Sequence, residues 1–286
     1  MQSQPSPPTT AELEQVARAN RSGKPPVVFV HGLWLLPSSW DPWRDMFEAA
    51  GYSTVAPGWP DDPETVQEGR KRPELFAGKS VGGITDHIAE VIKALDTKPA
   101  IIGHSFGGLI TQKLAGRALG VASVPIDPAP FRGVLPLPLS ALKAAFPVLK
   151  NPANKKRSIM LTYEQFRFAF VNAVDEAEAK RLYEMYPVPG SGIPLFQAAF
   201  ANLNPRTEAQ VDSTNPDRGP MKLLSGENDH TVPWAIANAS FKRQKRNSAV
   251  TEIEEMPGRG HSLVIDSGWE QVAESARTFI GRHVKT

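Results

Sequence analysis

The feature that most constrains this chain is a short glycine-rich segment between an apolar run and a helical pattern. Residues 100–102 read as a buried strand, and residues 109–114 read as a helix. Between them lies Gly103-His104-Ser105-Phe106-Gly107-Gly108, which places a serine at the apex of a very tight turn. A side chain at either glycine flanking the serine would crowd that turn. The turn also puts the Phe106 amide at a helix N-terminus, where it can donate to a developing negative charge.

The pattern G-x-S-x-G in a strand–turn–helix context is the nucleophile elbow, and in this respect the chain resembles the α/β-hydrolase family. The resemblance implies an α/β fold with a mostly parallel sheet of about six to eight strands, flanked by helices. Alternation of strand and helix patterns agrees with parallel βα units. The expected strands are 27–30, 53–56, 100–102, 122–126, 221–225 and 250–253. The alternative interpretation of G-x-S-x-G is a glycine-rich strand-to-helix turn whose serine has no catalytic role.

The spacing of these strands predicts how the chain is divided. About ninety residues separate the strands at 122–126 and 221–225, too many for one loop in a compact domain. They are helix-like in four pieces, at 139–149, 163–174, 176–186 and 195–203. Their placement resembles the helical cap of many α/β-hydrolases. We therefore expect a tail and helix at 1–24, a core formed by 25–130 and 219–286, and a cap at 131–218.

One departure from the family pattern lies at the N-terminus. Many members carry a hairpin before the strand that ends in a His-Gly pair, which here is His31-Gly32. The preceding residues show only a weak helical pattern, at 10–21. This favours a short sheet of six strands, with the N-terminal helix in an unusual position.

A serine hydroxyl needs a histidine to take its proton and a carboxylate to orient that histidine. In the family these follow the serine in the order acid, then histidine. His261 lies in a glycine-flanked loop after the last strand and is the predicted base. His283 falls in the last helix and His230 directly abuts the acid, so both are poorer candidates. Asp229 is the favoured acid, and Asp127, after the strand that follows the elbow, is the alternative.

The resemblance also predicts the groups around the triad. The amides of Phe106 and Leu33 are expected to form the oxyanion hole, with Trp34 in reserve, and His31 is expected to be structural. Aromatic side chains, most of them in the expected cap, are candidates to line a substrate pocket. The candidates are Trp34, Phe131, Tyr163, Tyr183, Tyr186 and Phe196.

Composition excludes several other kinds of protein. The net charge of +2, with basic clusters that lack interleaved aromatics, argues against a nucleic-acid partner. No apolar run approaches the ~20 residues of a membrane span. The absence of cysteine excludes thiol chemistry and, together with an N-terminus unlike a signal peptide, favours a cytoplasmic location. No metal or organic cofactor is expected, and the oligomeric state stays open.

These observations predict a serine hydrolase that cleaves carboxylic esters of small to medium, partly apolar substrates through an acyl-enzyme. The same triad serves lactonases, C–C bond hydrolases, hydroxynitrile lyases and cofactor-free perhydrolases, so these remain alternatives. A ligand-binding receptor of the same fold is another, although an intact set of serine, histidine and aspartate disfavours it. Serine at the elbow argues against the covalent alkyl-enzyme chemistry that needs a carboxylate there.

Overall fold

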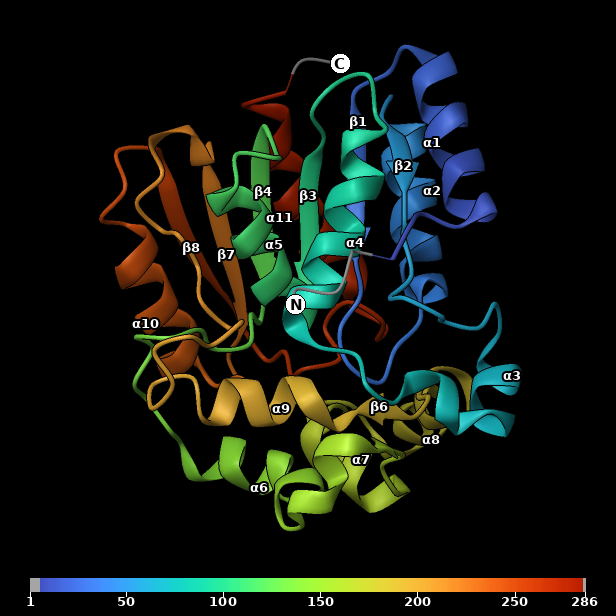
Figure 1. Cartoon of the computed structure of the whole chain (residues 1–286), viewed down its shortest axis with the longest axis vertical. Helices are drawn as coiled ribbons and strands as arrows, with labels where there is room; N and C mark the ends of the chain where they lie inside the picture. Colours follow the sequence, from blue (N-terminus) through green and yellow to red (C-terminus); the bar gives the residue numbers. More distant parts are fainter. Residues whose placement is uncertain (1–5, 285–286) are drawn as a thin grey trace.

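A six-stranded, entirely parallel sheet organises residues 6–284, which the computed structural model describes (Figure 1). The strand order is β2-β1-β3-β4-β7-β8, and every neighbouring pair is parallel. The sequence predicted all six strands. Their bounds are β1 (Pro26–Val30), β2 (Ser53–Val55), β3 (Ala100–His104), β4 (Ala122–Ile126), β7 (Met221–Gly226) and β8 (Thr251–Met256).

Helices cover both faces of this sheet, as right-handed crossovers require. In Figure 1, α4 (Val81–Lys93) and α5 (Phe106–Gly116) lie in front of the sheet, and α11 (Trp269–Gly281) lies behind it. The helix α10 (Trp234–Gln244) shares the front face, because Gln244 donates to the side chain of Gln112 in α5 at 3.0 Å. The helix α2 (Asp41–Ala49) packs against α11. The molecule is thus a three-layer helix–sheet–helix sandwich.

Behind β1, aromatic side chains fill the space between the sheet and α2. Phe29 of β1 contacts Trp40, Trp43 and Phe47, with ring centroids 5.2–6.4 Å apart. The short helix η1 (Pro37–Trp40) leads into α2 and carries the first of these tryptophans. Each ring is fully buried, which contributes about 1.5–3 kcal/mol of transfer free energy per side chain. This cluster fixes the end of β1, from which the His-Gly pair leaves the sheet.

The N-terminal helix α1 (Thr10–Ser22) covers the outer edge of β2. Gln15 accepts a hydrogen bond from the Ala56 amide at 3.0 Å, and Arg18 donates to the carbonyl of Thr54 at 3.3 Å. Side chains of a helix thereby pair with edge groups that a further strand would otherwise bond. The unusual N-terminus predicted from the missing hairpin has this physical explanation. Of the predicted tail, residues 1–5 lie outside the described part of the chain.

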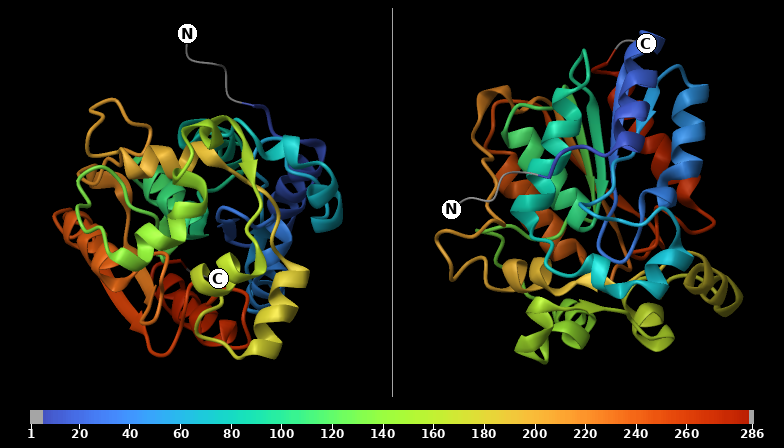
Figure 2. Two further views of the ribbon diagram at one scale, coloured as in Figure 1. Left: turned by 90° about the horizontal axis from the view of Figure 1, so that it is seen from below. Right: turned by 45° about the vertical axis from the view of Figure 1, so that its right-hand side comes forward.

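The residues between β4 and β7 form a layer across one end of the sheet (Figures 1 and 2). Phe170 leaves the helix to pack on His261, so α7 ends earlier than the predicted 163–174. The sequence pattern did not reveal a two-stranded antiparallel ribbon in the same layer. The elements are α6 (Leu139–Leu149), η3 (Pro152–Lys156), β5 (Ser158–Ile159), α7 (Tyr163–Ala169), α8 (Glu176–Met185), β6 (Gly190–Ser191) and α9 (Gly192–Ala199).

Short helices complete the described chain. Two lie in the proline-rich stretch 57–78: α3 (Val66–Lys71) and η2 (Pro73–Phe76). A third, η4 (Pro216–Arg218), precedes β7. None of the helices within residues 6–284 is both long enough and apolar enough to cross a membrane.

Candidate active site

The elbow is built by close approach of backbone to backbone. Ser105 has φ 57° and ψ −118°, a strained conformation for a residue with a side chain. A methyl group on Gly107 would collide with the carbonyl oxygen of Val30, and one on Gly103 would collide with the carbonyl oxygen of Gly107. The Ser105 amide donates to the carbonyl of Ile126 at 2.9 Å. Neighbouring strands therefore hold the turn in place, and only glycine fits on either side of it.

His261 follows a loop with two glycines, of which Gly258 has φ +71°. Its imidazole is fully buried and lies against the rings of Phe170 and His104, with centroids 4.7 and 4.6 Å away. Because His104 directly precedes Ser105, this contact brings the His261 loop against the elbow. Nδ1 of His261 lies 2.6 Å from Oδ2 of Asp229. A carboxylate only accepts, so Nδ1 carries the proton and Nε2 is an acceptor.

The second nitrogen of this imidazole is available. Within the described residues, Nε2 of His261 has no hydrogen-bond partner although it is buried. A general base needs one nitrogen oriented by a carboxylate and the other able to accept the proton of the nucleophile; within the described residues Oγ of Ser105 does not donate to Nε2, which leaves that nitrogen open.

Asp229, in the loop after β7, has both carboxylate oxygens occupied. Oδ1 accepts from the amides of Thr231 and Val232 at 2.6 and 2.9 Å, while Oδ2 accepts from His261. Burial works to raise its pKa, but the His261 charge and these hydrogen bonds outweigh burial and lower the pKa below its usual value. Asp229 is therefore ionised at neutral pH.

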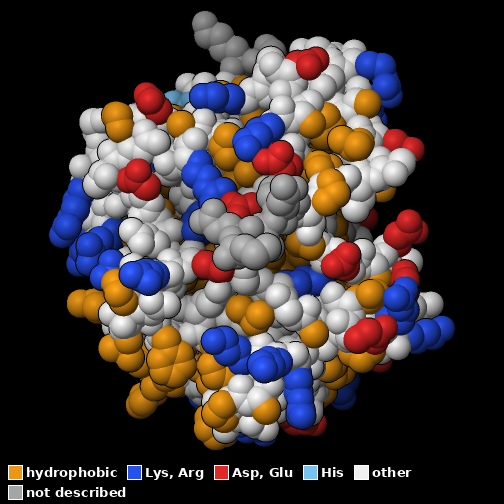
Figure 3. Space-filling model, viewed as in Figure 1, with side chains coloured by type: hydrophobic (Ala, Val, Ile, Leu, Met, Phe, Trp, Pro, Cys, Tyr) orange, Lys and Arg blue, Asp and Glu red, His pale blue; other side chains and the backbone are white. Residues whose placement is uncertain are grey.

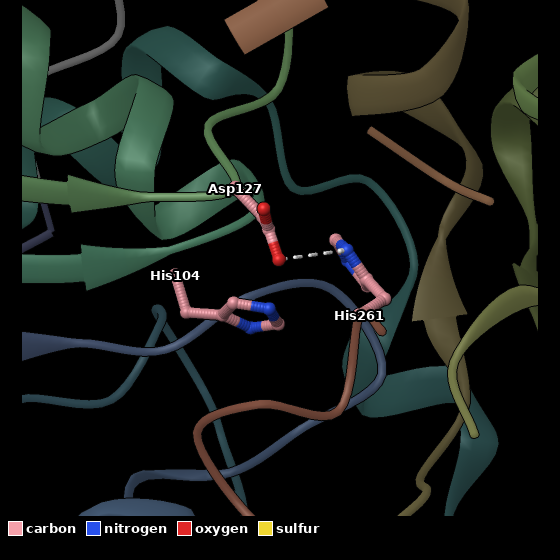
Figure 4. Close-up of side chains that lie close together, drawn as sticks. All are labelled: His104, Asp127 and His261. Carbon is pink, nitrogen blue, oxygen red and sulfur yellow. Dashed lines mark ion pairs between the residues drawn. The ribbon is translucent and has the colours of Figure 1, made fainter. Parts of the chain in front are cut away.

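Asp127, the alternative acid, differs from Asp229 in its surroundings. Its Oδ2 lies 3.9 Å from Nδ1 of His261, the ion pair drawn as a dashed line in Figure 4, and this distance is too long for a hydrogen bond. Its Oδ1 accepts from the Gly226 amide at 2.8 Å. Burial, and next the negative charge of Asp229, raise the pKa of Asp127 well above its usual value. The two carboxyls thus differ in environment: the pKa of Asp127 is raised and that of Asp229 is lowered.

His104 completes this buried group. Neither of its ring nitrogens has a hydrogen-bond partner in the described part of the chain, and burial lowers its pKa well below the usual value. His104, Asp127 and His261 each offer one ligand atom, and these lie within 4.8 Å of one another (Figure 4). A metal ion there would compete for the His261 imidazole that Asp229 already orients, so the donor set fits acid–base chemistry better than metal binding.

Two backbone amides are placed to stabilise negative charge near Ser105. The Phe106 amide is the first of α5, and Leu33 follows Gly32, whose added methyl group would lie 2.9 Å from Cβ of Ser105. Among residues 6–284, neither amide has an acceptor. The turn at Leu33 is positioned by His31, whose Nε2 lies 3.0 Å from the Asp62 carboxylate.

His31 belongs to a buried ionic cluster that supports this turn. Its ring stacks on Trp59, and Lys79 contacts the other carboxylate oxygen of Asp62 at 2.5 Å. Burial works to raise the pKa of Asp62, but His31 and Lys79 hold it below the usual value. The sequence predicted a structural role for His31 but gave no sign of its partners, which come from a loop about thirty residues later and from Lys79, two residues before α4.

A cavity of about 280 Å³ opens over Ser105 and Phe106. None of the described residues that line it is charged, and its walls come mainly from α6, α9 and the loop before α6. Leucine, proline and alanine side chains predominate. The lining residues outside the elbow are Trp34, Ala129, Pro130, Val134, Leu135, Pro136, Leu137, Ala141, Leu142, Ala144, Ala145, Leu149, Leu195, Ala198, Ala199, Asn202, Thr231, Val232 and Ile236.

Of the six aromatic residues predicted to line a pocket, Trp34 lines this cavity and the other five do not. Phe131 is buried in the core, and Tyr163 and Tyr183 pack on each other. Tyr186 packs against the core, and Phe196 lies at a separate surface groove. Aromatics in short helices serve the packing of those helices, so small aliphatic residues are left to form the cavity wall. The run Leu135-Pro136-Leu137-Pro138 was the available signal, because proline keeps Leu135 and Leu137 out of a helix.

The comparisons with known proteins agree with this architecture. A model described as the alpha/beta hydrolase family matches residues 27–275, and the chain belongs to that family. A comparison with curated proteins gives no significant match.

Solved structures with this fold cover most of the chain. A monoacylglycerol lipase from Paleococcus ferrophilus has 20% identity and a TM-score of 0.62, over 91% of this chain and 96% of the lipase. A pyrethroid hydrolase from Sphingobium faniae has 17% identity and a TM-score of 0.62, over 89% and 96%. An extracellular α/β-hydrolase from a Paenibacillus species has 17% identity and a TM-score of 0.60, over 92% and 100%. At these identities the likeness shows the fold.

Proposed function

We propose that this protein is a serine hydrolase that cleaves carboxylic esters of small to medium, partly apolar substrates. The observation that carries the proposal is the pair His261–Asp229, joined at 2.6 Å, with Nε2 of the histidine unpaired among the residues that the structure describes. Ser105 lies in the adjoining strained turn and lines the cavity. A strained serine, an oriented imidazole and an ionised carboxylate together form a nucleophile with its base.

The mechanism uses these groups in sequence. Oγ of Ser105 attacks the ester carbonyl while Nε2 of His261 takes the hydroxyl proton, and Asp229 stabilises the resulting imidazolium. The amides of Phe106 and Leu33 donate to the oxyanion, a contribution of about 3–4 kcal/mol per donor. The tetrahedral intermediate collapses, the C–O bond to the alcohol breaks, and His261 protonates the leaving oxygen. Water, deprotonated by the same histidine, then releases the acid from Ser105.

Asp229, and not Asp127, is the acid in this proposal. Only Asp229 is within hydrogen-bond distance of Nδ1 of His261, and only Asp229 has its pKa lowered. A carboxyl with a raised pKa keeps its proton more readily, so Asp127 is the poorer source of negative charge for the imidazolium.

The segment 131–218 acts as a cap in this proposal, and the cavity decides the substrate class. The cavity contains no charge, so a charged acyl or alcohol group would lose its hydration there without a partner. A volume of about 280 Å³ lies at the small end for ligand sites, which favours a short or medium acyl group.

Ser105→Ala is the direct test of the nucleophile. We expect hydrolysis of p-nitrophenyl esters to fall by about 10⁴-fold or more. A fluorophosphonate probe should label the wild-type protein at Ser105 and leave the variant unlabelled. Full turnover by Ser105→Ala would overturn the proposal, and so would an unlabelled wild type. A panel of esters of increasing acyl length, with lactones included, then identifies the substrate class.

A further inference from the structure

The segment around the mouth of the cavity exposes an unusual number of large apolar side chains. Among the described residues, half of the ten exposed large hydrophobics fall within residues 135–146. We call these five the apolar rim: Leu135, Leu137, Leu139, Leu142 and Phe146. Three of them are 65–84% exposed, namely Leu135, Leu137 and Leu139. Figure 3 shows hydrophobic side chains gathered at the lower left, over the region of α6 in Figure 1.

The rim is continuous with the cavity. Leu135, Leu137 and Leu142 are exposed and also line the cavity, whereas Leu139 and Phe146 lie outside its wall. Whatever covers the rim therefore lies where a substrate enters. Contiguous exposed apolar surface of this kind typically marks an interaction site, because single exposed leucines are common and clusters are not.

The charged residues of the same segment are all positive. Between Pro128 and Tyr163 the chain has six basic residues and no aspartate or glutamate, although the whole chain is nearly balanced at 32 basic and 30 acidic residues. All six basic side chains are exposed, and none forms an ion pair with another described residue. They are Arg132, Lys143, Lys150, Lys155, Lys156 and Arg157. The helix η3, with two of these lysines, packs directly against α6.

The apolar rim and the cations together restrict the kind of partner that can cover this surface. A second copy of the chain would bring like charges together around the leucines, which disfavours a symmetric contact between copies. Protein interfaces are also depleted in lysine. Exposed leucines in one segment with exposed cations that form no ion pair among the described residues match a surface that lies in the headgroup layer of an anionic lipid.

We propose that the apolar rim and its surrounding cations dock this protein onto an anionic lipid surface. The leucines enter the headgroup layer, and the lysines and arginines lie against its negative charges. An apolar molecule can then pass from the lipid into the cavity without crossing water. The docking itself does not depend on the proposed ester hydrolysis. Only the statement that docking delivers a substrate to the cavity rests on that proposed function.

Vesicle binding by full-length Ser105→Ala tests the docking without hydrolysis of the lipid. Vesicles of phosphatidylcholine with phosphatidylglycerol should bind the protein at least about tenfold more tightly than phosphatidylcholine alone, and added salt should weaken binding. Equal binding to both vesicles, or no binding to either, would overturn the proposal.

Two pairs of substitutions, each with a matched control, locate the surface. In the Ser105→Ala background, Leu139→Ser with Phe146→Ser should weaken binding about tenfold or more, and Lys155→Glu with Lys156→Glu should do the same. The controls carry the same kind of change at the opposite end of the strands: Val250→Ser, and Lys24→Glu with Lys98→Glu. Equal effects of rim and control variants would refute the location.

Two further measurements distinguish lipid docking from a damaged active site and from self-association. With Ser105 intact, the variant with both Leu139→Ser and Phe146→Ser should hydrolyse a dissolved short-chain ester at the wild-type rate, since neither residue lines the cavity. Sedimentation velocity should show the same oligomeric state for wild type and variant. A dimer that the variant abolishes would make the rim a contact between copies and refute lipid docking.

Discussion

The elbow and the segment 131–218 are built in opposite ways, although both line the same cavity. At the elbow, Gly103 and Gly107 leave no room for a methyl group, and Ser105 is held by hydrogen bonds to the backbone around β4. The segment exposes leucines and lines the cavity with alanines beside empty space. The proposed chemistry thus lies where the backbone admits no other side chain. Substrate choice lies where side chains can change at small cost in stability.

The largest expected effect separates the two carboxylates of the core. Asp229→Asn should lower kcat for p-nitrophenyl esters about 10⁴-fold, because the amide favours the wrong tautomer of His261. Asp127→Asn is the matched control and should cost less than about tenfold, because a protonated carboxyl and an amide both lack charge. Initial rates at saturating substrate give both values. A larger loss for Asp127→Asn would reverse the assignment of the acid.

A single methyl group tests how tightly the elbow is packed. Gly107→Ala should lower the free energy of unfolding by about 3 kcal/mol, since its Cβ would meet the carbonyl oxygens of Val30 and His31. Gly83→Ala makes the same change in α4, where the nearest atom is Oγ of Ser80 at 3.5 Å. That control should stabilise the protein by about 0.5–1 kcal/mol. Urea unfolding measures both, and equal values would contradict the comparison.

In the segment 131–218, a larger side chain in the cavity wall should change the preference for ester chain length and leave the free energy of unfolding nearly unchanged. Ala198→Phe places a ring in the cavity of about 280 Å³ and should lower kcat/KM for long-chain esters about 10–100-fold relative to short-chain esters. Ala153→Phe, on the exposed helix η3 outside the cavity wall, should leave the ratio unchanged. An unaltered chain-length profile for Ala198→Phe would show that the acyl group binds elsewhere.

The smallest effect concerns the helix at the edge of the sheet. Burial works to lower the pKa of His87, but its hydrogen bonds with Glu12 at 3.0 Å and with the Ser6 carbonyl at 2.9 Å raise it above the usual value. The stabilisation is therefore complete below about pH 6.5, the unfolded value, and is lost as pH rises through the folded pKa. Burial also works to raise the pKa of Glu12, yet His87 and Thr9 lower it. The Glu12 contribution is lost as pH falls below about 4.5.

His87→Gln checks that sign. The difference in Tm between wild type and His87→Gln should be larger at about pH 6 than at about pH 8. For His283→Gln, at the other end of the chain, the difference should not increase toward low pH, because burial lowers the pKa of His283. A difference that grows with pH would contradict the direction of the His87 shift.

The sequence by itself determined the alternation of strands and helices and the residues offered for catalysis. The six strands, the elbow at Ser105 and the glycine-hinged loop of His261 follow from local patterns, because apolar periodicity and glycine sterics act over a few residues. Local patterns also identified Asp127 and Asp229 as the candidate acids. They gave no distance from either carboxylate to His261.

Tertiary structure alone gave the distances of the two carboxylates from His261, the side chains that form the cavity wall and the way α1 covers the edge of β2. Each depends on the direction of side chains from segments far apart in the chain. Asp229 and His261 are 32 residues apart, and Arg18 and Thr54 are 36 residues apart. The packing of helices against the sheet sets the positions of these side-chain atoms to within about an ångström. The pattern of apolar and polar residues along the sequence carries no information on that scale.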